Sequence, residues 1–197
     1  MQASLFGHEP PALDPGFTRL ERVCLDAESW IDRCPGWVSG HETLFETLRG
    51  AMRWQAQRRP MYDRVVEVPR LLASVPRDGA HPLLDEMSRR LSVRYRAALT
   101  SITLALYRDG RDSVAWHADQ ELRDRPTATV VVVSLGGPRK FMVRPAEGGP
   151  SRAWSVGWGD LMVMGGACQR RWHHAVPKQR HADPRMALMF RTHRQSD

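Results

Sequence analysis

The chain has 197 residues, of which 42% are hydrophobic and 26% charged, proportions that are ordinary for one soluble globular domain. No apolar run approaches the roughly 18 residues that a membrane span needs, and the polar, proline-rich segment 1–16 does not look like a secretory signal, so we expect no membrane association. The net charge of +7 favours polyanions such as nucleic acids as partners.

The cysteines argue against a disulfide framework. There are three of them, Cys24, Cys34 and Cys168, which is an odd number, and no C-x-x-C motif occurs. We therefore expect a reducing, cytoplasmic environment. Cys24 and Cys34 are interpreted as small buried apolar groups and not as a bridge.

The first half of the chain alternates helix-like and proline-rich segments. From the N-terminus, the pattern predicts an extended arm over 1–20, a short helix in AESWIDRC from Asp26 to the stop at Pro35-Gly36, a helix over His41–Arg49, an irregular stretch over 51–80, and a helix over 82–95.

After residue 97 the pattern changes to short β-type segments separated by Gly, Pro and Asp. Eight segments rich in Val, Leu, Thr and Trp are predicted strands, at 102–107, 113–119, 127–135, 140–145, 151–156, 160–164, 171–176 and 185–191. Together they predict an α+β fold with a double-stranded β-helix (jelly-roll) core over 98–197. Residues 1–97 are expected to add an extension, supporting helices and a substrate lid within the same structural domain.

The sequence Trp116-His117-Ala118-Asp119 offers two metal ligands on one predicted strand. Residues i and i+2 share a face of a strand, so His117 and Asp119 can aim at one point. An imidazole and a carboxylate are two members of the 2-His-1-carboxylate triad that holds Fe(II) with positions left open.

Several histidines are candidates for the third ligand: His173, His174, His181 and His193. Adjacent residues of a strand face opposite sides, so at most one of His173 and His174 can enter a cavity. The alternative is that both histidines lie on an exposed edge strand.

The last predicted strand carries two arginines, Arg185 and Arg191, whose even spacing places them on one face. An arginine facing a barrel interior is costly unless it meets an anion, and a dicarboxylate would supply one. The alternative places both arginines on the solvent face.

These motifs occur in an order that resembles the AlkB family of Fe(II)- and 2-oxoglutarate-dependent dioxygenases. The resemblance covers residues 100–194 and rests on Tyr107-Arg108-Asp109-Gly110, His117–Asp119, Ser134-Leu135-Gly136 with Arg139 and Phe141, Gly159-Asp160 with Met164, Trp172 to Pro177, and Arg185 with Phe190-Arg191.

The resemblance implies roles for particular residues. His174 would be the distal iron ligand, Tyr107, Arg185 and Arg191 would contact 2-oxoglutarate, and Glu121 would face the substrate base. O2 would be the co-reactant, and hydroxylation of an N-alkyl carbon would release succinate, CO2 and formaldehyde. The chain departs from the family at two positions, because Ala105 and Ala187 stand where nucleic-acid-repairing members usually carry Asn.

The expected substrate is alkylated DNA or RNA, single-stranded or with the base flipped out, since a stacked base cannot reach a buried iron. Met61 and Tyr62 are candidate lid residues that would pack on the base, with Trp54 as a rival. We expect the protein to act as a monomer. Two alternatives stay open: the same chemistry on a protein or small molecule, and a jelly-roll binding module without catalysis.

Overall fold

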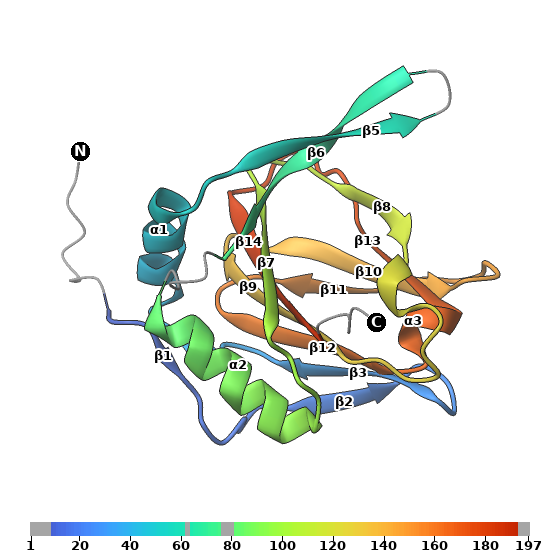
Figure 1. Ribbon diagram of the computed structural model, residues 1–197, viewed down its shortest axis with the longest axis horizontal. Helices are drawn as coiled ribbons and strands as arrows, with labels where there is room; N and C mark the ends of the chain where they lie inside the picture. Colours follow the sequence, from blue (N-terminus) through green and yellow to red (C-terminus); the bar gives the residue numbers. More distant parts are fainter. Residues whose placement is uncertain (1–8, 62–63, 76–80, 193–197) are drawn as a thin grey trace, which may run out of the picture.

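The computed structural model describes residues 9–61, 64–75 and 81–192, with the side chains of 57–61 and 64–68 outside the description. Two antiparallel sheets face each other, and two helices cover the outside of the larger sheet (Figure 1). The elements are β1 (Ala12–Leu13), β2 (Glu21–Cys24), β3 (Ser29–Cys34), β4 (Val38–Ser39), α1 (His41–Ala51), β5 (Gln55–Met61), β6 (Arg64–Ser74), α2 (Pro82–Tyr95), β7 (Ser101–Tyr107), β8 (Val114–His117), the 3-10 helix η1 (Gln120–Leu122), β9 (Val130–Gly136), β10 (Arg139–Pro145), β11 (Arg152–Val156), β12 (Asp160–Gly166), α3 (Cys168–Arg171), β13 (Trp172–Val176) and β14 (Arg185–Arg191).

The large sheet has the order β2-β3-β12-β9-β14-β7-β6-β5, and the small sheet has the order β11-β10-β13-β8. One hydrophobic cluster, which includes Val132, Phe141 and Met162, fills the space between the sheets. A second joins α1 and α2 to the outer face of the large sheet through residues such as Leu44 and Met87. This arrangement is the expected jelly-roll with supporting helices.

All eight strands expected after residue 97 are present, as are the helices at 41–51 and 82–95. The second of these helices begins as its sequence suggests. Pro82 occupies its first turn, and Nδ1 of His81 accepts a hydrogen bond from the Leu83 amide at 3.1 Å.

The short helix expected from Asp26 was wrong, because Ser29–Cys34 forms β3. This strand pairs along its whole length with β12 and with β2 on its other side. The indole of Trp30 packs against Gly165, its partner on β12, where an added Cβ would lie 2.0 Å from the ring. Pairing with a strand 130 residues away therefore overrides the local helical pattern.

The irregular stretch expected over 51–80 was also wrong, since β5 and β6 form a hairpin that extends the large sheet past β7 (Figure 1). The prolines of this hairpin are compatible with strand pairing because of their positions. Pro60 is on β5, the edge strand, and Pro69 lies where the β5–β6 register shifts and before the β6–β7 pairing begins at Leu71. Neither position removes a ladder bond from the interior of the sheet.

The N-terminal half is therefore not purely a helical layer, because β2, β3, β5 and β6 belong to the same sheet as β7, β9, β12 and β14. The division into a lid-bearing region 1–97 and a catalytic region 98–197 stays a prediction. Within the described residues, none of the helices has the length and apolar character that crossing a membrane would require. All three cysteines are free, with Cys34 buried as expected and Cys24 exposed, contrary to expectation.

Candidate metal and cosubstrate site

The structure brings His117, Asp119 and His174 together, with their nearest ligand atoms within 4.8 Å of one another. His117 on β8 and His174 on β13 are directly paired residues of the small sheet, and their ring centroids are 4.2 Å apart. Asp119 follows β8 at the start of η1, and its Oδ1 lies 4.0 Å from Nε2 of His117. Strand pairing thus places the two imidazoles side by side, and the turn after β8 brings the carboxylate of Asp119 to the same point. Asp119 was expected on the strand itself, but β8 ends at His117.

Both imidazoles are set up as neutral ligands. Nδ1 of His117 lies 2.9 Å from the carbonyl oxygen of Ala115, which can only accept, so Nδ1 carries the proton and Nε2 keeps its lone pair. Burial lowers the pKa of His117. Burial, followed by the neighbouring His117, lowers the pKa of His174 to about 3, so that no proton competes for it near neutral pH.

The carboxylate of Asp119 is held in its charged form. Burial alone would raise its pKa, but Arg191 outweighs that effect, and the pKa lies below its ordinary value. Nε of Arg191 donates to Oδ2 of Asp119 at 2.7 Å, and its Nη1 donates to Oγ1 of Thr103 at 3.1 Å. Arg191 therefore faces the interior, as expected, where it contacts a candidate ligand. Its contact with 2-oxoglutarate stays a prediction.

The other candidate histidines lie elsewhere. His173 faces away from the group, opposite Arg144 on β10, and its pKa is lowered by burial and by the positive charges of Arg123 and Arg144. His181 is exposed in the loop before β14, and His193 is outside the described residues. Of the adjacent pair, only His174 points toward Asp119.

Near this group lies a cluster of arginines around the buried ring of Tyr107, which is 2% exposed. Arg185 is 1% exposed, its guanidinium lies 5.2 Å from the centre of the Tyr107 ring, and its Nη2 donates to Oγ of Ser134 at 2.7 Å. Its buried Nε has no hydrogen-bond partner among the described residues. Burial lowers the pKa of Arg185 to about 10. A buried guanidinium with a free donor fits an anionic ligand.

Two residues of this cluster were given no role by the sequence reasoning. Arg70 on β6 donates from Nη1 to the Tyr107 hydroxyl at 2.9 Å, and its Nε is likewise buried without a partner in the described part of the chain. It was missed because β6 was interpreted as irregular, although the run Val65-Val66, Val68 and Leu71-Leu72 is typical of a strand.

Arg139 is the second of these residues; it was quoted for the family resemblance without a role, and its role differs from that of Arg70. It is fully buried and lies 5.4 Å from the Tyr107 ring centre. Its donors are already used by the side chain of Gln179 and by the carbonyl oxygens of Asp109, Asp112 and Pro177. Arg139 therefore fastens neighbouring loops together.

The two alanines that depart from the family pattern lie in the same region. Ala105 and Ala187 are paired residues of β7 and β14, two positions along from the pair Tyr107 and Arg185, and both are buried. The structure shows no side-chain amide at either place, while Arg70 approaches Tyr107 from the next strand.

The expected substrate contacts are only partly described. Glu121 is exposed on η1, the short helix that begins directly after Asp119. Met61 ends β5 with its side chain outside the description, and Tyr62 lies outside the described residues. Trp54 packs against the outer hydrophobic cluster and donates to the Arg49 carbonyl oxygen, which makes it a packing residue.

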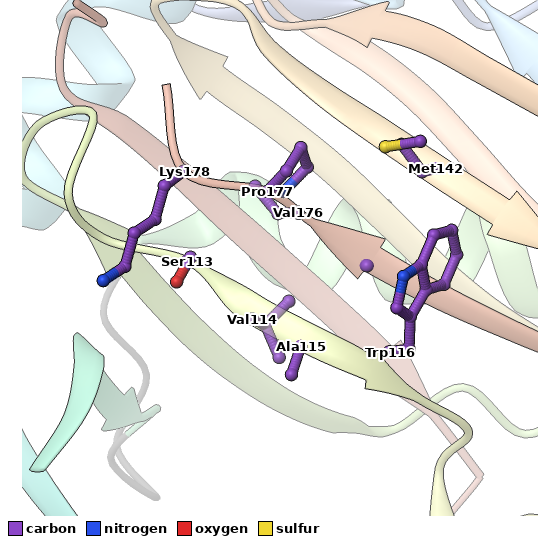
Figure 2. A pocket seen from close by; sticks show the side chains of 9 residues that line it. Ser113, Val114, Ala115, Trp116, Met142, Val176, Pro177 and Lys178 are labelled. Atoms are coloured by element: carbon purple, nitrogen blue, oxygen red, sulfur yellow. The ribbon is translucent and has the colours of Figure 1, made fainter. Parts of the chain in front are cut away.

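A shallow hollow lies on the opposite face of the small sheet. Figure 2 shows Trp116, Met142 and Lys178 lining it, together with residues of β8 and β13. The guanidinium of Arg144 covers the Trp116 ring at 4.4 Å. Since Trp116 and His117 point to opposite faces of β8, this hollow is separate from the metal group.

Comparison with known proteins gives a consistent assignment. Residues 33–196 match the family described as the 2OG-Fe(II) oxygenase superfamily. Alpha-ketoglutarate-dependent dioxygenase alkB homolog 3 from Bos taurus is 30% identical over 89% of this chain and 67% of its own length. DNA oxidative demethylase ALKBH2 from Arabidopsis thaliana is 30% identical over 58% of this chain and 44% of its own length.

The fold agrees with solved structures. The structure of OsALKBH1 superposes with a TM-score of 0.55 at 14% identity, covering 88% of this chain and all of that one. An oxidoreductase of the 2OG-Fe(II) oxygenase family from Burkholderia pseudomallei gives a TM-score of 0.52 at 11% identity, covering 77% of this chain and 78% of the other. With its His-Asp-His group between the two sheets, this chain belongs to the 2OG-Fe(II) oxygenase superfamily.

Proposed function

We propose that this protein is a 2-oxoglutarate-dependent dioxygenase that oxidatively demethylates N-alkylated bases in DNA or RNA. The observation that carries the proposal is that two neutral histidines and an ionised aspartate lie near a buried guanidinium with no carboxylate partner among the described residues. The names of the relatives, dioxygenase and DNA oxidative demethylase, support the same reaction.

His117, Asp119 and His174 would hold the iron. Two imidazole nitrogens and one carboxylate are the donor set typical of non-haem Fe(II) oxygenases, in which one face of the metal stays open for other ligands. Arg191 keeps the carboxylate ionised, and burial keeps both imidazoles unprotonated. The residues present therefore fit this metal.

Arg185 would bind a carboxylate of 2-oxoglutarate, with Tyr107 and Arg70 beside it. The orphaned Nε of Arg185 supplies the donor that such a carboxylate needs. Arg70 brings a second cation to the Tyr107 hydroxyl, in a region where Ala105 and Ala187 offer no side-chain amide groups. Both guanidinium groups thus act by orienting and neutralising the cosubstrate.

When bound, iron, 2-oxoglutarate and O2 would supply the oxidising power that hydroxylates an N-methyl carbon, with 2-oxoglutarate converted to succinate and CO2; the hydroxymethyl product would then lose formaldehyde. The protein's own contribution is to exclude water, to keep Asp119 charged through Arg191, and to hold the cosubstrate against Arg185. Glu121, exposed beside the metal group, would accept a hydrogen bond from an exocyclic amine of the base.

Several cations would contact the phosphates of the nucleic acid. Arg170 and Lys178 are exposed, and we add Arg123, which follows η1. Arg171 is a weaker candidate than these, because its Nη1 is engaged by Glu28 at 2.6 Å. From the sequence alone, Arg58, Arg59 and Arg64 of the hairpin are further candidates, and their side chains lie outside the described part of the chain.

We further infer a monomeric, cytoplasmic protein that takes a single-stranded or flipped base. Met61 and Tyr62, at the end of the hairpin, would form one wall of the base pocket. The need to unstack a base before it reaches a buried metal supports the single-stranded or flipped base, the basic charge supports a nucleic-acid partner, and the free cysteines support the cytoplasmic location.

The proposal is tested by measuring formaldehyde release from N-methylated oligonucleotides, single- and double-stranded, DNA and RNA, with iron and 2-oxoglutarate. We expect release from at least one of these substrates, lost in Asp119→Ala and reduced in Glu121→Ala. Affinity for an unmethylated strand should be unchanged in Glu121→Ala and should fall steeply with salt, by about 0.9 log units per log unit of salt for each duplex phosphate contacted.

If 2-oxoglutarate is consumed while no oligonucleotide yields formaldehyde, the substrate is a protein or small molecule. If neither metal nor 2-oxoglutarate binds, the chain is a jelly-roll binding module.

A further inference from the structure

The three candidate ligands are not fixed in place in the same way. His117 and His174 lie within paired strands, so the small sheet sets their positions. Asp119 lies beyond the end of β8, with φ −67° and ψ 104°, at the first residue of the turn that becomes η1. Its backbone is therefore placed by contacts outside the strand ladder.

One buried side chain makes such a contact. Gln169 is 2% exposed and belongs to α3, the single helical turn that joins β12 to β13. Its Oε1 accepts a hydrogen bond from the backbone amide of Asp119 at 2.9 Å. Its Nε2 points the other way and donates to the sulfur of Met164 on β12 at 3.7 Å.

The two bonds of this amide differ in strength. A carbonyl oxygen facing a backbone N–H makes an ordinary hydrogen bond, whereas a thioether sulfur is a weak acceptor. The contact to Asp119 is therefore the stronger of the two, and it links residues 50 positions apart. A neutral acceptor also adds no negative charge beside the carboxylate, which already carries its compensating charge from Arg191.

We propose that Gln169 is a positioning residue for the metal ligand Asp119. Gln169 fixes the backbone of Asp119 and Arg191 fixes its carboxylate, so that the third ligand is held from both ends against the two imidazoles. This inference rests on the proposed metal site, and it assigns to α3 the task of completing that site.

The test compares Gln169→Leu with Gln169→Glu and Met164→Leu in the full chain without metal. Leucine removes the acceptor at nearly constant volume, and glutamate keeps an acceptor for the Asp119 amide. Met164→Leu removes only the sulfur partner. The affinity for Mn(II) is measured from the EPR signal of the free ion. Exchange of the Asp119 amide proton is followed by NMR, and thermal unfolding of each metal-free variant gives its stability.

We expect Gln169→Leu to weaken Mn(II) binding by about 10- to 100-fold, the range typical of residues that orient metal ligands. In that variant the Asp119 amide should exchange about tenfold faster or more. Gln169→Glu should retain at least wild-type affinity, and Met164→Leu should stay within about twofold of it, because volume-conserving swaps disturb a core little.

Unchanged Mn(II) affinity in Gln169→Leu, or equal losses in Gln169→Leu and Met164→Leu, would overturn the proposal and leave only a packing role. The same holds if the wild-type chain binds no Mn(II). By contrast, tight Mn(II) binding that depends on Gln169, in a protein that releases no formaldehyde, would support this inference while the proposed nucleic-acid substrate fails.

Discussion

Replacing Arg185 by methionine separates the stability of the fold from the binding of the cosubstrate. Arg185 is buried, its Nε has no partner among the described residues, and its described hydrogen bond goes to a hydroxyl, Oγ of Ser134, and not to a carboxylate. Methionine has a similar length and no charge, so in the protein without 2-oxoglutarate Arg185→Met removes the free-energy cost of burying this guanidinium. The same change removes the group proposed to bind the cosubstrate.

The size of the effect follows from the pKa of the guanidinium. Burial lowers it from 12.5 to about 10, which at 1.36 kcal/mol per unit corresponds to about 3 kcal/mol. The folded-state pKa lies below the unfolded one, and both lie far above neutral pH. The group is therefore charged in both states, and the folded state carries the cost at every pH used in the assay. After loss of the bond to Ser134, we expect Arg185→Met to be about 1 to 3 kcal/mol more stable than wild type without cosubstrate.

The assay is denaturant unfolding with Mn(II), with and without 2-oxoglutarate at about 100 times its wild-type dissociation constant. Wild type should gain about 2.7 kcal/mol from the ligand, and Arg185→Met should gain almost nothing. Arg139→Met is the matched control, since Arg139 is also buried near the Tyr107 ring but donates a hydrogen bond from each of its three guanidinium nitrogens. It should lose a few kcal/mol because buried carbonyl groups lose their donor.

The reasoning fails if Arg185→Met is less stable than wild type without cosubstrate and still gains stability from 2-oxoglutarate. It fails equally if Arg185→Met and Arg139→Met behave alike.

The remaining predictions concern the metal group and its surroundings. Asp119→Ala should abolish 2-oxoglutarate turnover, because two imidazoles hold Fe(II) poorly; full turnover, measured as succinate, would remove Asp119 from the site. His173→Ala should keep Mn(II) affinity while His174→Ala loses it, and the reverse result would reverse the assignment. Through His174, the free energy of unfolding of the metal-free protein should fall by about 2 kcal/mol between pH 7 and pH 5, because the imidazole of His174 binds a proton below pH 6.5 in the unfolded state but stays neutral down to about pH 3 in the folded state. His174→Asn should weaken this pH dependence, and an equal pH dependence of the unfolding free energy in wild type and variant would contradict the prediction. Asn at positions 105 and 187, in place of Ala105 and Ala187, should tighten 2-oxoglutarate binding if the lost amides matter, and an unchanged dissociation constant would mean that the pocket is rebuilt without them.

The sequence predicted the parts of the fold that are encoded locally. The strands after residue 97 are short, rich in β-branched residues and bounded by turn residues, so each is recognisable alone. The pair His117 and Asp119 was found by strand spacing, and His174 by its place in a family motif. None of these inferences needed to know which strands pair.

The missed parts depend on contacts between distant segments. The strand at 29–34 is defined by its pairing with β12, and its own sequence looks more like a helix than a strand. Strand β6 is defined by its pairing with β7, and its prolines outweighed its strand-like apolar residues in the prediction. Arg70 and Gln169 were missed for the same reason, because each acts on a residue far along the chain.

The central claim is that one site holds both the metal and the cosubstrate. A crystal structure with Mn(II) and 2-oxoglutarate, with the metal located by its anomalous scattering, tests it most directly. The account predicts the ion on His117, Asp119 and His174 and a carboxylate of 2-oxoglutarate on Arg185. An ion bound through His173, or a cosubstrate that leaves Arg185 without an anionic partner, would contradict it.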